Sequence, residues 1–243
     1  MNTTSTSSIS VSGISVHIDR KDIKNLHVGV YPPHGRVRVA APIKIDDEAV
    51  RLAVINRLSW IKRQVRHFED QQRETQREMI SGESHYFFGK RYLLEVVYGS
   101  MKHEVVLRHS IIELYVRTGT TVENRQKLLH AWYRENLKIE VAKFISKYEK
   151  VMNLKVPKWE IKKMKTKWGS CHIKNQNILF NLNLARVPLE CIEYIVVHEM
   201  VHFLERRHNE IFKSYLDRFM PHWQQCRDIL NQSSLGYEEW GIE

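Results

Sequence analysis

The amino-acid sequence predicts an α+β fold, in which antiparallel β segments and two long helices precede a mixed sheet and a helix rich in histidine. Two observations lead to this prediction. Apolar residues alternate with polar ones in several short runs, as in strands, and elsewhere recur at spacings of three and four, as on helices. Residues 198–202 then read His-Glu-Met-Val-His inside an apolar stretch. With 243 residues, the chain can bury an ample core in one large domain or two small ones.

The chain is expected to have three parts. Residues 1–12 are rich in serine and threonine and predict a short disordered leader, without the basic and apolar regions of a secretory signal. Residues 13–120 are expected to form an N-terminal β-rich region with one long helix. Residues 121–243 are expected to form a second domain, which contains the histidine motif.

The N-terminal region begins with three predicted strands at residues 13–20, 24–31 and 36–41, where apolar and polar residues alternate between turns. Asp46 then caps a helix. The apolar stripe of this helix consists of Leu52, Ile55, Leu58, Ile61, Val65 and Phe68. Residues 69–78 are mostly charged or glutamine, and predict a solvated helix end or a linker.

The middle of the chain predicts a second group of antiparallel strands, at residues 93–98, 104–107 and 111–116. Residues 124–153 predict a second long helix with a broad apolar face, which is more typical of a core than of a ligand platform. That face consists of Leu129, Trp132, Tyr133, Leu137, Val141, Phe144, Ile145 and Tyr148.

The last third predicts strands at residues 159–164 and 177–184, followed by a helix that begins at Val187-Pro188-Leu189-Glu190 and contains the histidine motif. The strand at 177–184 directly precedes this helix and is expected at the edge of its sheet, either as an ordinary edge strand or as one with which an extended peptide can pair. Proline at the first helical position and an acid in the first turn favour this start. The remaining expected elements are a polar turn at 205–209 and helical segments at 211–219 and 223–230.

His198 and His202 are four residues apart, so on a helix both imidazoles point to one face, one turn apart. Both can then reach one small cation, while Glu199 leaves on an adjacent face and can hold a water bound to that cation. This spacing is typical of the H-E-x-x-H zinc site. The motif therefore predicts a zinc ion on the two histidines, with Glu199 as the catalytic carboxylate.

His208 is the candidate third ligand, because three protein ligands and a water complete the open coordination of a catalytic zinc. The expected polar turn would bring it back toward the metal. In the H-E-x-x-H-x-x-G-x-x-H metalloproteases a glycine stands where this chain has Glu205. A tight turn with positive φ is therefore not assured there, and the helix can run a turn further.

Charge and cysteine content restrict the setting and the partners. The net charge of +10 favours polyanionic partners, such as nucleic acid, nucleotides or acidic protein surfaces. Residues 158–174 hold six lysines and one acid, and Gly169 within them predicts a bend or a close backbone approach. Three widely spaced cysteines, Cys171, Cys191 and Cys226, favour a reducing, cytoplasmic setting. No stretch is long enough to span a membrane, and no feature indicates the oligomeric state.

Four stretches together resemble the YgjP-like metallopeptidases, cytoplasmic zincins usually described as SprT-like. They are residues 165–171 (Lys-Thr-Lys-Trp-Gly-Ser-Cys), 177–181, 194–202 and His208-Asn209 ahead of Phe212. The resemblance implies a zincin-like metallopeptidase core, with a sheet edge strand beside the H-E-x-x-H helix, and makes residues 121–243 a catalytic domain. It implies zinc on His198, His202 and His208, Glu199 as catalytic acid and base, and a protein or peptide substrate. Some members have also been described as nucleotide pyrophosphatases.

The leading hypothesis is a zinc metallopeptidase, in which Glu199 accepts a proton from the zinc-bound water and passes it to the leaving amine. The group that stabilises the oxyanion is open among Tyr194, Ser170, Arg206 and Arg207.

Two alternatives remain. In the first, the lysine-rich segment binds a triphosphate, and the chain is a metal-dependent nucleotide pyrophosphohydrolase. Against it, the sequence has no P-loop, and three histidines suit zinc better than a phosphate-bridging magnesium. In the second, the chain is a basic nucleic-acid-binding module with a structural zinc site, to which Cys171 would be the fourth ligand.

Overall fold

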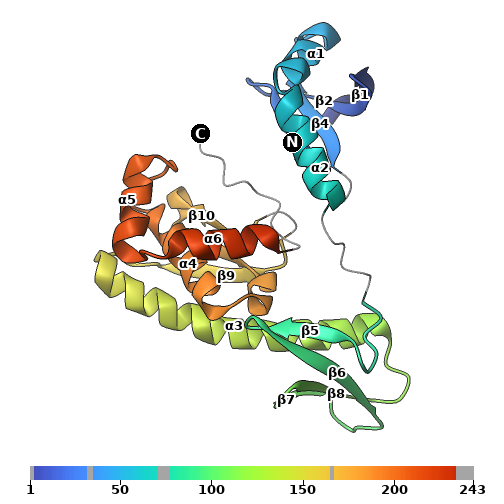
Figure 1. The fold of residues 1–243 in the computed structure, drawn as a ribbon, viewed down its shortest axis with the longest axis vertical. Coiled ribbons are helices and arrows are strands. Elements are labelled where there is room, and N and C mark those ends of the chain that lie inside the picture. Colours follow the sequence, from blue (N-terminus) through green and yellow to red (C-terminus); the bar gives the residue numbers. More distant parts are fainter. Residues whose placement is uncertain (1–2, 32–34, 71–76, 165–166, 234–243) are drawn as a thin grey trace. The chain divides into compact units, whose positions relative to one another are not determined.

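The computed structural model describes residues 3–31, 35–70, 77–164 and 167–233 (Figure 1). The fold is mixed α and β. The chain divides into two compact units, residues 1–73 and residues 74–243, rather than at the expected boundary after residue 120. No helix among the described residues is long and apolar enough to cross a membrane.

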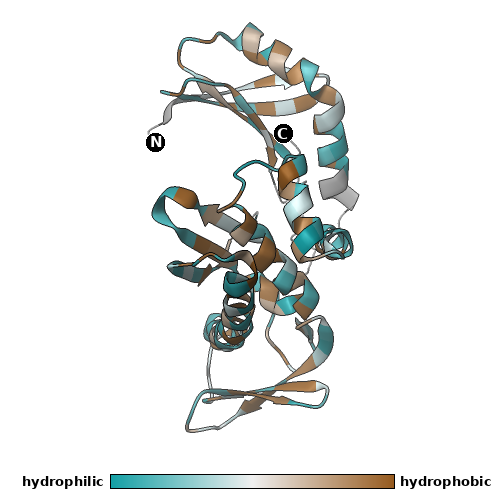
Figure 2. Cartoon of the chain, turned by 90° about the vertical axis from the view of Figure 1, so that its left-hand side faces the viewer, coloured by the Kyte–Doolittle hydropathy of each residue, from teal (hydrophilic) through white to brown (hydrophobic). Residues whose placement is uncertain are grey.

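The first unit is a four-stranded sheet with two helices. Its elements are β1 (Thr3–Val11), β2 (Ile14–Lys21), β3 (His27–Tyr31), β4 (Arg36–Pro42), α1 (Asp47–Asn56) and α2 (Leu58–Asp70). Apolar side chains from alternate positions of β2 and β4 form a core with the helices, and Figure 2 shows this alternation along the strands. The fully or almost fully buried members include Val16, Ile18, Val37, Val39, Val50, Val54 and Ile61.

Most of the expected disordered leader is a strand. β1 pairs antiparallel with β2, so that Ile9 lies opposite Val16 and Val11 opposite Ile14. Val11 is buried in the core of the first unit. Serine and threonine lower the hydrophobicity that a sequence pattern relies on, but the ladder needs only their backbone groups. The strand is therefore specified by its partner rather than by its own composition.

The first predicted long helix consists of two helices. Asp46 caps α1 as expected, and its side chain accepts a hydrogen bond of 2.8 Å from the backbone N–H of Ala49. At Arg57 (φ −110°, ψ 11°) the backbone leaves the helical region, and its N–H bonds to Val54 O at 3.1 Å. This tighter turn ends α1, and α2 begins at the next residue. The side chain of Phe68 and most of the expected linker lie outside the described residues.

The second unit contains the remaining elements. They are β5 (Ser84–Phe87), β6 (Lys90–Tyr98), β7 (Glu104–Arg108), β8 (Ile111–Val116), α3 (Val122–Met152), β9 (Lys158–Lys162), β10 (Gly169–His172), the 3₁₀ turn η1 (Ile173–Asn175), β11 (Asn177–Asn181), the 3₁₀ turn η2 (Leu182–Arg186), α4 (Leu189–Val201), α5 (Glu210–Phe219) and α6 (Trp223–Gln232).

The two four-stranded sheets share one topology, which differs from the expected antiparallel arrangement. Their strand orders are β1-β2-β4-β3 and β5-β6-β8-β7, and in each the central pair is parallel. The outer pairs are antiparallel. Each sheet is thus two antiparallel pairs joined side by side. Periodicity predicts where strands lie but not the order in which they pair. It therefore could not predict the parallel strand pairs.

The long helix α3 joins the second sheet to the histidine-bearing helix. It packs against β7 and β8 as well as against η2 and α4, and Figure 1 shows it lying along both. One hydrophobic core therefore extends from β5–β8 to α6. Its members on α3 are Leu129, Tyr133, Leu137, Val141, Ile145, Tyr148 and Met152, which matches most of the predicted apolar face.

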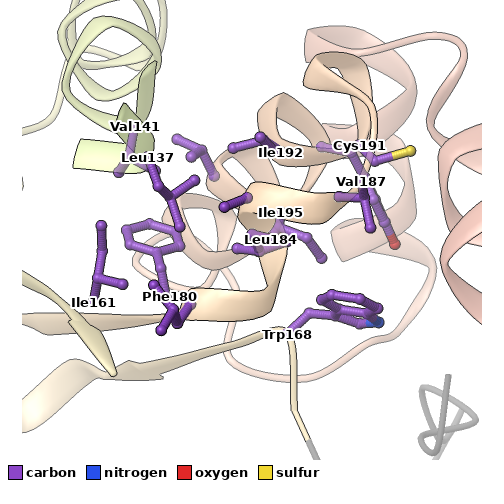
Figure 3. Packing of buried hydrophobic residues seen from close by; sticks show 14 of the residues in the cluster. Leu137, Val141, Ile161, Trp168, Phe180, Leu184, Val187, Cys191, Ile192 and Ile195 are labelled. Atoms are coloured by element: carbon purple, nitrogen blue, oxygen red, sulfur yellow. The ribbon is translucent and has the colours of Figure 1, made fainter. Parts of the chain in front are cut away.

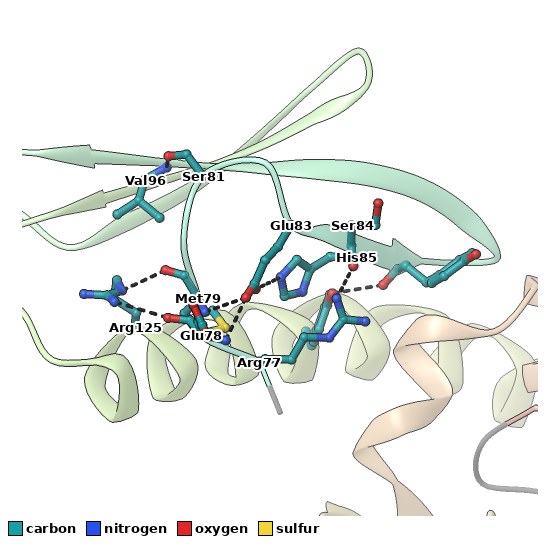
Figure 4. Close-up of polar contacts among 11 residues, drawn as sticks. Arg77, Glu78, Met79, Ser81, Glu83, Ser84, His85, Val96 and Arg125 are labelled. Atoms are coloured by element: carbon teal, nitrogen blue, oxygen red, sulfur yellow. Dashed lines mark hydrogen bonds and ion pairs between the residues drawn. The ribbon is translucent and has the colours of Figure 1, made fainter. Parts of the chain in front are cut away.

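The segment before β5 is fastened to α3 by a buried arginine, which explains the position of the unit boundary. Arg125 is 7% exposed and donates to the carbonyls of Met79 at 2.9 Å and Glu78 at 3.3 Å (Figure 4). It also donates to the carbonyl of Thr120. The carboxylate of Glu83 accepts from the backbone N–H groups of Glu78 and Met79 at 2.7 and 3.0 Å. The bonds from Arg125 to Met79 and Glu78, 46 and 47 residues earlier, attach this segment to α3.

A three-stranded sheet stands beside α4. Its order is β10-β11-β9, with β9 parallel and β10 antiparallel to the central β11, so β10 is an edge strand. The predicted strand at 177–184 ends at Asn181, and the chain continues as η2 into α4. This strand is central rather than at the expected edge, because β9 and β10 pair with its two sides. Phe180, Leu184 and Ile195 pack between this sheet and α4 (Figure 3).

Candidate metal centre

The helix α4 carries the histidine motif into the core. Ten of its 13 residues are buried, and His198 and Glu199 are only 2% and 1% exposed. The helix begins after Pro188 with Glu190 in its first turn, close to the predicted start. It ends at Val201 with His202 as its C-cap, so the motif lies at the end of the helix rather than in its middle.

The chain turns back after α4 without a glycine. The N–H groups of Leu204 and Glu205 both bond to Val201 O at 2.8 Å, which closes the turn that ends the helix. The carboxylate of Glu205 accepts from the N–H of Arg207 at 2.9 Å. Glu205 therefore stands in the turn where the comparable motif has glycine, and the helix does not run on.

Asn209 then starts α5, because its side chain accepts the N–H of Phe212 at 3.0 Å. This cap fixes the chain immediately after His208. The result is that all three predicted histidines meet: Nε2 of His208 lies 3.1 Å from Nε2 of His198 and 3.2 Å from Nε2 of His202. Their ligand atoms all lie within 4.8 Å of one another.

One aromatic ring supports the whole cluster. The ring centroid of Phe212 lies 4.8 Å from those of His198 and His202 and 4.7 Å from that of His208. Through Phe212, the helix after His208 packs behind the imidazoles. The individual role of Phe212 was not visible in the sequence, although its place one turn after His208 offers a signal.

The imidazoles of His198 and His202 are held in their neutral form. Burial, followed by the charges of His202 and His208, lowers the pKa of His198 well below its ordinary value of 6.5. Burial and the charge of His208 lower the pKa of His202 to about 4. Neutral imidazole is the form that binds metals, so these two histidines have the protonation state that a cation site needs.

Glu199 faces the edge strand. A Cβ built on Gly169 would lie 2.4 Å from Oε1 of Glu199 and 2.8 Å from its Cδ, so only glycine leaves room for this carboxylate. The close backbone approach expected at Gly169 is thus present. Cys171, two residues along β10, lies close enough that the charge of Glu199, after burial, contributes to raising the pKa of its thiol to about 12.

The structure brings some of the other predicted residues to the cluster. The ring of Tyr194 is buried, with its centroid 5.8 Å from that of His198. Burial raises the pKa of this phenol above its ordinary value. Ser170 follows Gly169 on β10, whereas Arg206 and Arg207 are exposed in the turn before His208. Among the described residues, Cys171 does not join the three histidines as a fourth ligand.

Comparison with known proteins places the chain in a family. A family model described as the YgjP-like metallopeptidase domain matches residues 25–233 of the chain. No curated protein matches it. Among solved structures, the chain is similar to the crystal structure of the metallopeptidase zymogen of Pyrococcus abyssi abylysin, with a TM-score of 0.36 and 17% sequence identity over 37% of this chain and 91% of that chain.

Proposed function

The chain belongs to the YgjP-like metallopeptidase family, and from this premise we propose that it is a zinc-dependent peptidase with Glu199 as its catalytic acid and base. The family match supports a metal-dependent hydrolase. To this we add, as our proposal, zinc as the metal, the three histidine ligands, the role of Glu199 and a zincin-like core built from β10 and α4. The observation that carries them is the convergence of His198, His202 and His208 beside a buried glutamate.

The donor set fits zinc. Three neutral imidazole nitrogens are ligands that zinc favours, whereas magnesium and calcium prefer oxygen. Three protein ligands leave one coordination position open, which distinguishes a catalytic zinc from a closed structural one. The position of Cys171, outside the histidine group among the described residues, supports the open arrangement over a nucleic-acid-binding module with a structural zinc.

The protein's own residues would divide the work as follows. The three histidines hold the cation, and Phe212 keeps their rings in one arrangement. When bound, zinc would supply Lewis-acid chemistry, by polarising the substrate carbonyl and lowering the pKa of water. Glu199 would accept a proton from the attacking water and deliver it to the leaving amine. Its burial against Gly169 restricts where the carboxylate can lie.

The substrate would be an extended peptide, which can pair with the edge strand β10 through main-chain hydrogen bonds. We further propose a cytoplasmic location, in keeping with three free cysteines. Nucleic acid or nucleotide binding through the basic segment remains a secondary proposal. Part of that segment is neutralised locally, since Glu160 pairs with Lys158 at 3.1 Å and with Lys162 at 3.3 Å.

The test is Glu199→Gln, with Glu190→Gln as a control in the exposed first turn of α4. Glu199→Gln should keep about one zinc per chain and lose hydrolysis of unfolded casein by about a hundredfold or more. Glu190→Gln should keep both. Unchanged hydrolysis in Glu199→Gln would remove this residue from the mechanism. A parallel assay with nucleoside triphosphates, with and without chelator, distinguishes the peptidase from the pyrophosphohydrolase alternative. That alternative requires hydrolysis of the triphosphates and no hydrolysis of casein.

A further inference from the structure

The link between β9 and β10 passes the end of the central strand. β9 and β10 lie on opposite sides of β11, and the chain leaves β9 at Lys162, level with Asn181, and enters β10 at Gly169, level with Phe180. The link must therefore cross the end of β11, where Asn181 is the last residue. A crossing of this kind removes backbone groups from the sheet ladder, and they need other partners.

The side chain of Asn181 supplies those partners. It is fully buried, and its Nδ2 donates to Lys167 O at 2.6 Å and to Met164 O at 3.0 Å. Its Oδ1 accepts from the N–H groups of Met164 at 3.3 Å and Asn183 at 3.1 Å. Its own backbone N–H donates to Trp168 O at 2.8 Å. One residue thus fixes both described ends of the crossing and the residue before Gly169.

The fixed crossing ends against Glu199. Gly169 follows Trp168, whose ring is buried in the core, and the missing Cβ of Gly169 leaves the space that the Glu199 carboxylate fills. The φ of Gly169 lies outside the left-handed region that favours glycine. Space rather than backbone freedom therefore requires glycine here. The Glu199 carboxylate therefore packs directly against the backbone of residue 169.

We infer that Asn181 is a positioning residue for Glu199, acting through Trp168 and Gly169, so that a buried amide at the end of β11 sets where the carboxylate of α4 lies. This inference rests on the proposed function for its effect on catalysis, but its structural part does not. Asparagine suits the task because it donates and accepts on one planar group. Aspartate has the same shape but cannot donate to the two carbonyls.

The test compares Asn181→Asp with Asn183→Asp, both in the full chain. Asn183 lies two residues on, is half-buried, and contributes its backbone N–H rather than its side chain to this network. A crystal structure of each zinc-loaded variant gives the position of the Glu199 carboxylate relative to the Cα of residue 169. Hydrogen exchange measures the opening of residues 167–172, and zinc content checks the three histidines.

In Asn181→Asp we expect a displaced carboxylate, faster exchange in residues 167–172 and a kcat reduced by about ten- to a hundredfold with KM changed less than about twofold. Zinc content should stay at the wild-type level. In a Glu199→Gln background the same substitution should cause no further loss of kcat, whereas a general structural defect would add to it. Asn183→Asp should match the wild type in all respects.

Gly169→Ala tests the other end of the path and covers the case in which Asn181→Asp fails to fold. It should displace the Glu199 carboxylate and lower kcat in the same way. The hydrogen-exchange rates of the link between β9 and β10 should stay at the wild-type level. An unmoved Glu199 carboxylate in the folded variants overturns the inference. If the wild type hydrolyses no peptide, the proposed function fails, while the carboxylate position and the exchange rates still decide the role of Asn181.

Discussion

Phe212 lies one helical turn beyond His208, and the two ring centroids are 4.7 Å apart at an interplanar angle of 88°. The same ring lies 4.8 Å from the ring centroids of the other two imidazoles, so one apolar side chain of α5 contacts all three histidines. The geometry of the cluster therefore depends on packing as much as on the spacing of the motif.

Replacing Phe212 should loosen the metal site. Phe212→Ala removes a buried ring and should destabilise the protein by about 3 kcal/mol or more. It should also weaken zinc binding by roughly tenfold, since the imidazoles lose their common support. Urea denaturation and competition with a zinc chelator measure the two effects. Leu216→Ala, equally buried one turn further along α5, should cost stability but keep the zinc affinity, and equal losses of affinity in both variants would refute this role.

The turn between β5 and β6 should be sensitive to a single methyl group. Gly89 has φ of +79°, and a Cβ there would lie 2.8 Å from Cγ of Pro188, the N-cap of α4. Gly119 has φ of +78° but open space around it, so Gly119→Ala measures backbone strain alone. Gly89→Ala should lower the free energy of unfolding by about 1–3 kcal/mol more than this control. Equal denaturation midpoints for Gly89→Ala and Gly119→Ala would show that Pro188 accommodates the added methyl group without loss of stability.

Arg125 should be essential for the stability of the second unit. Arg125→Met keeps much of the buried side-chain volume but leaves the carbonyls of Glu78, Met79 and Thr120 without their donor. The expected loss is about 3 kcal/mol or more, because each such bond involves a charged group. Arg108→Met, which removes an exposed ion pair with Glu113, should have little effect. The prediction fails if the two variants unfold at the same urea concentration.

His130 should make the fold sensitive to mild acid. Burial, followed by the charges of Lys163, Arg134 and Arg186, lowers the pKa of this imidazole from 6.5 to about 4. Between pH 6.5 and about 4, His130 binds a proton in the unfolded chain but not in the folded chain. The free energy of unfolding is therefore highest above pH 6.5 and falls as the pH drops toward 4. His130→Gln should flatten part of this fall in urea midpoints, whereas His222→Gln, at an exposed position, should not. A pH profile unchanged by His130→Gln would contradict it.

The sequence was most informative where spacing alone determines geometry. Two histidines four apart on a helix must share a face, and a polar turn before His208 returned the third to them, as expected. The family resemblance was confirmed over residues 25–233. The sequence predicted a bend or a close backbone approach at Gly169, and the structure shows a close approach, to Glu199.

The sequence was least informative where structure depends on a distant partner. β1 was hidden by its serines and threonines, because its pairing with β2 uses backbone groups that every residue has. The unit boundary was misplaced because Arg125 bonds to carbonyls 46 and 47 residues earlier in the chain. Asn181 is an ordinary polar residue in the sequence, and only the crossing of its strand end gives it three side-chain hydrogen bonds to Met164 and Lys167.

The continuity of α3 restricts how the protein can be shortened. This helix has 31 residues, which corresponds to a length of about 46 Å. One part of it packs against the β5–β8 sheet, and the rest packs against α4. A fragment beginning at residue 121 would keep every histidine of the cluster yet uncover the apolar side chains on which the sheet rests. The smallest self-supporting piece should therefore begin near Arg77, and a recombinant fragment trimmed to the motif would be expected to aggregate.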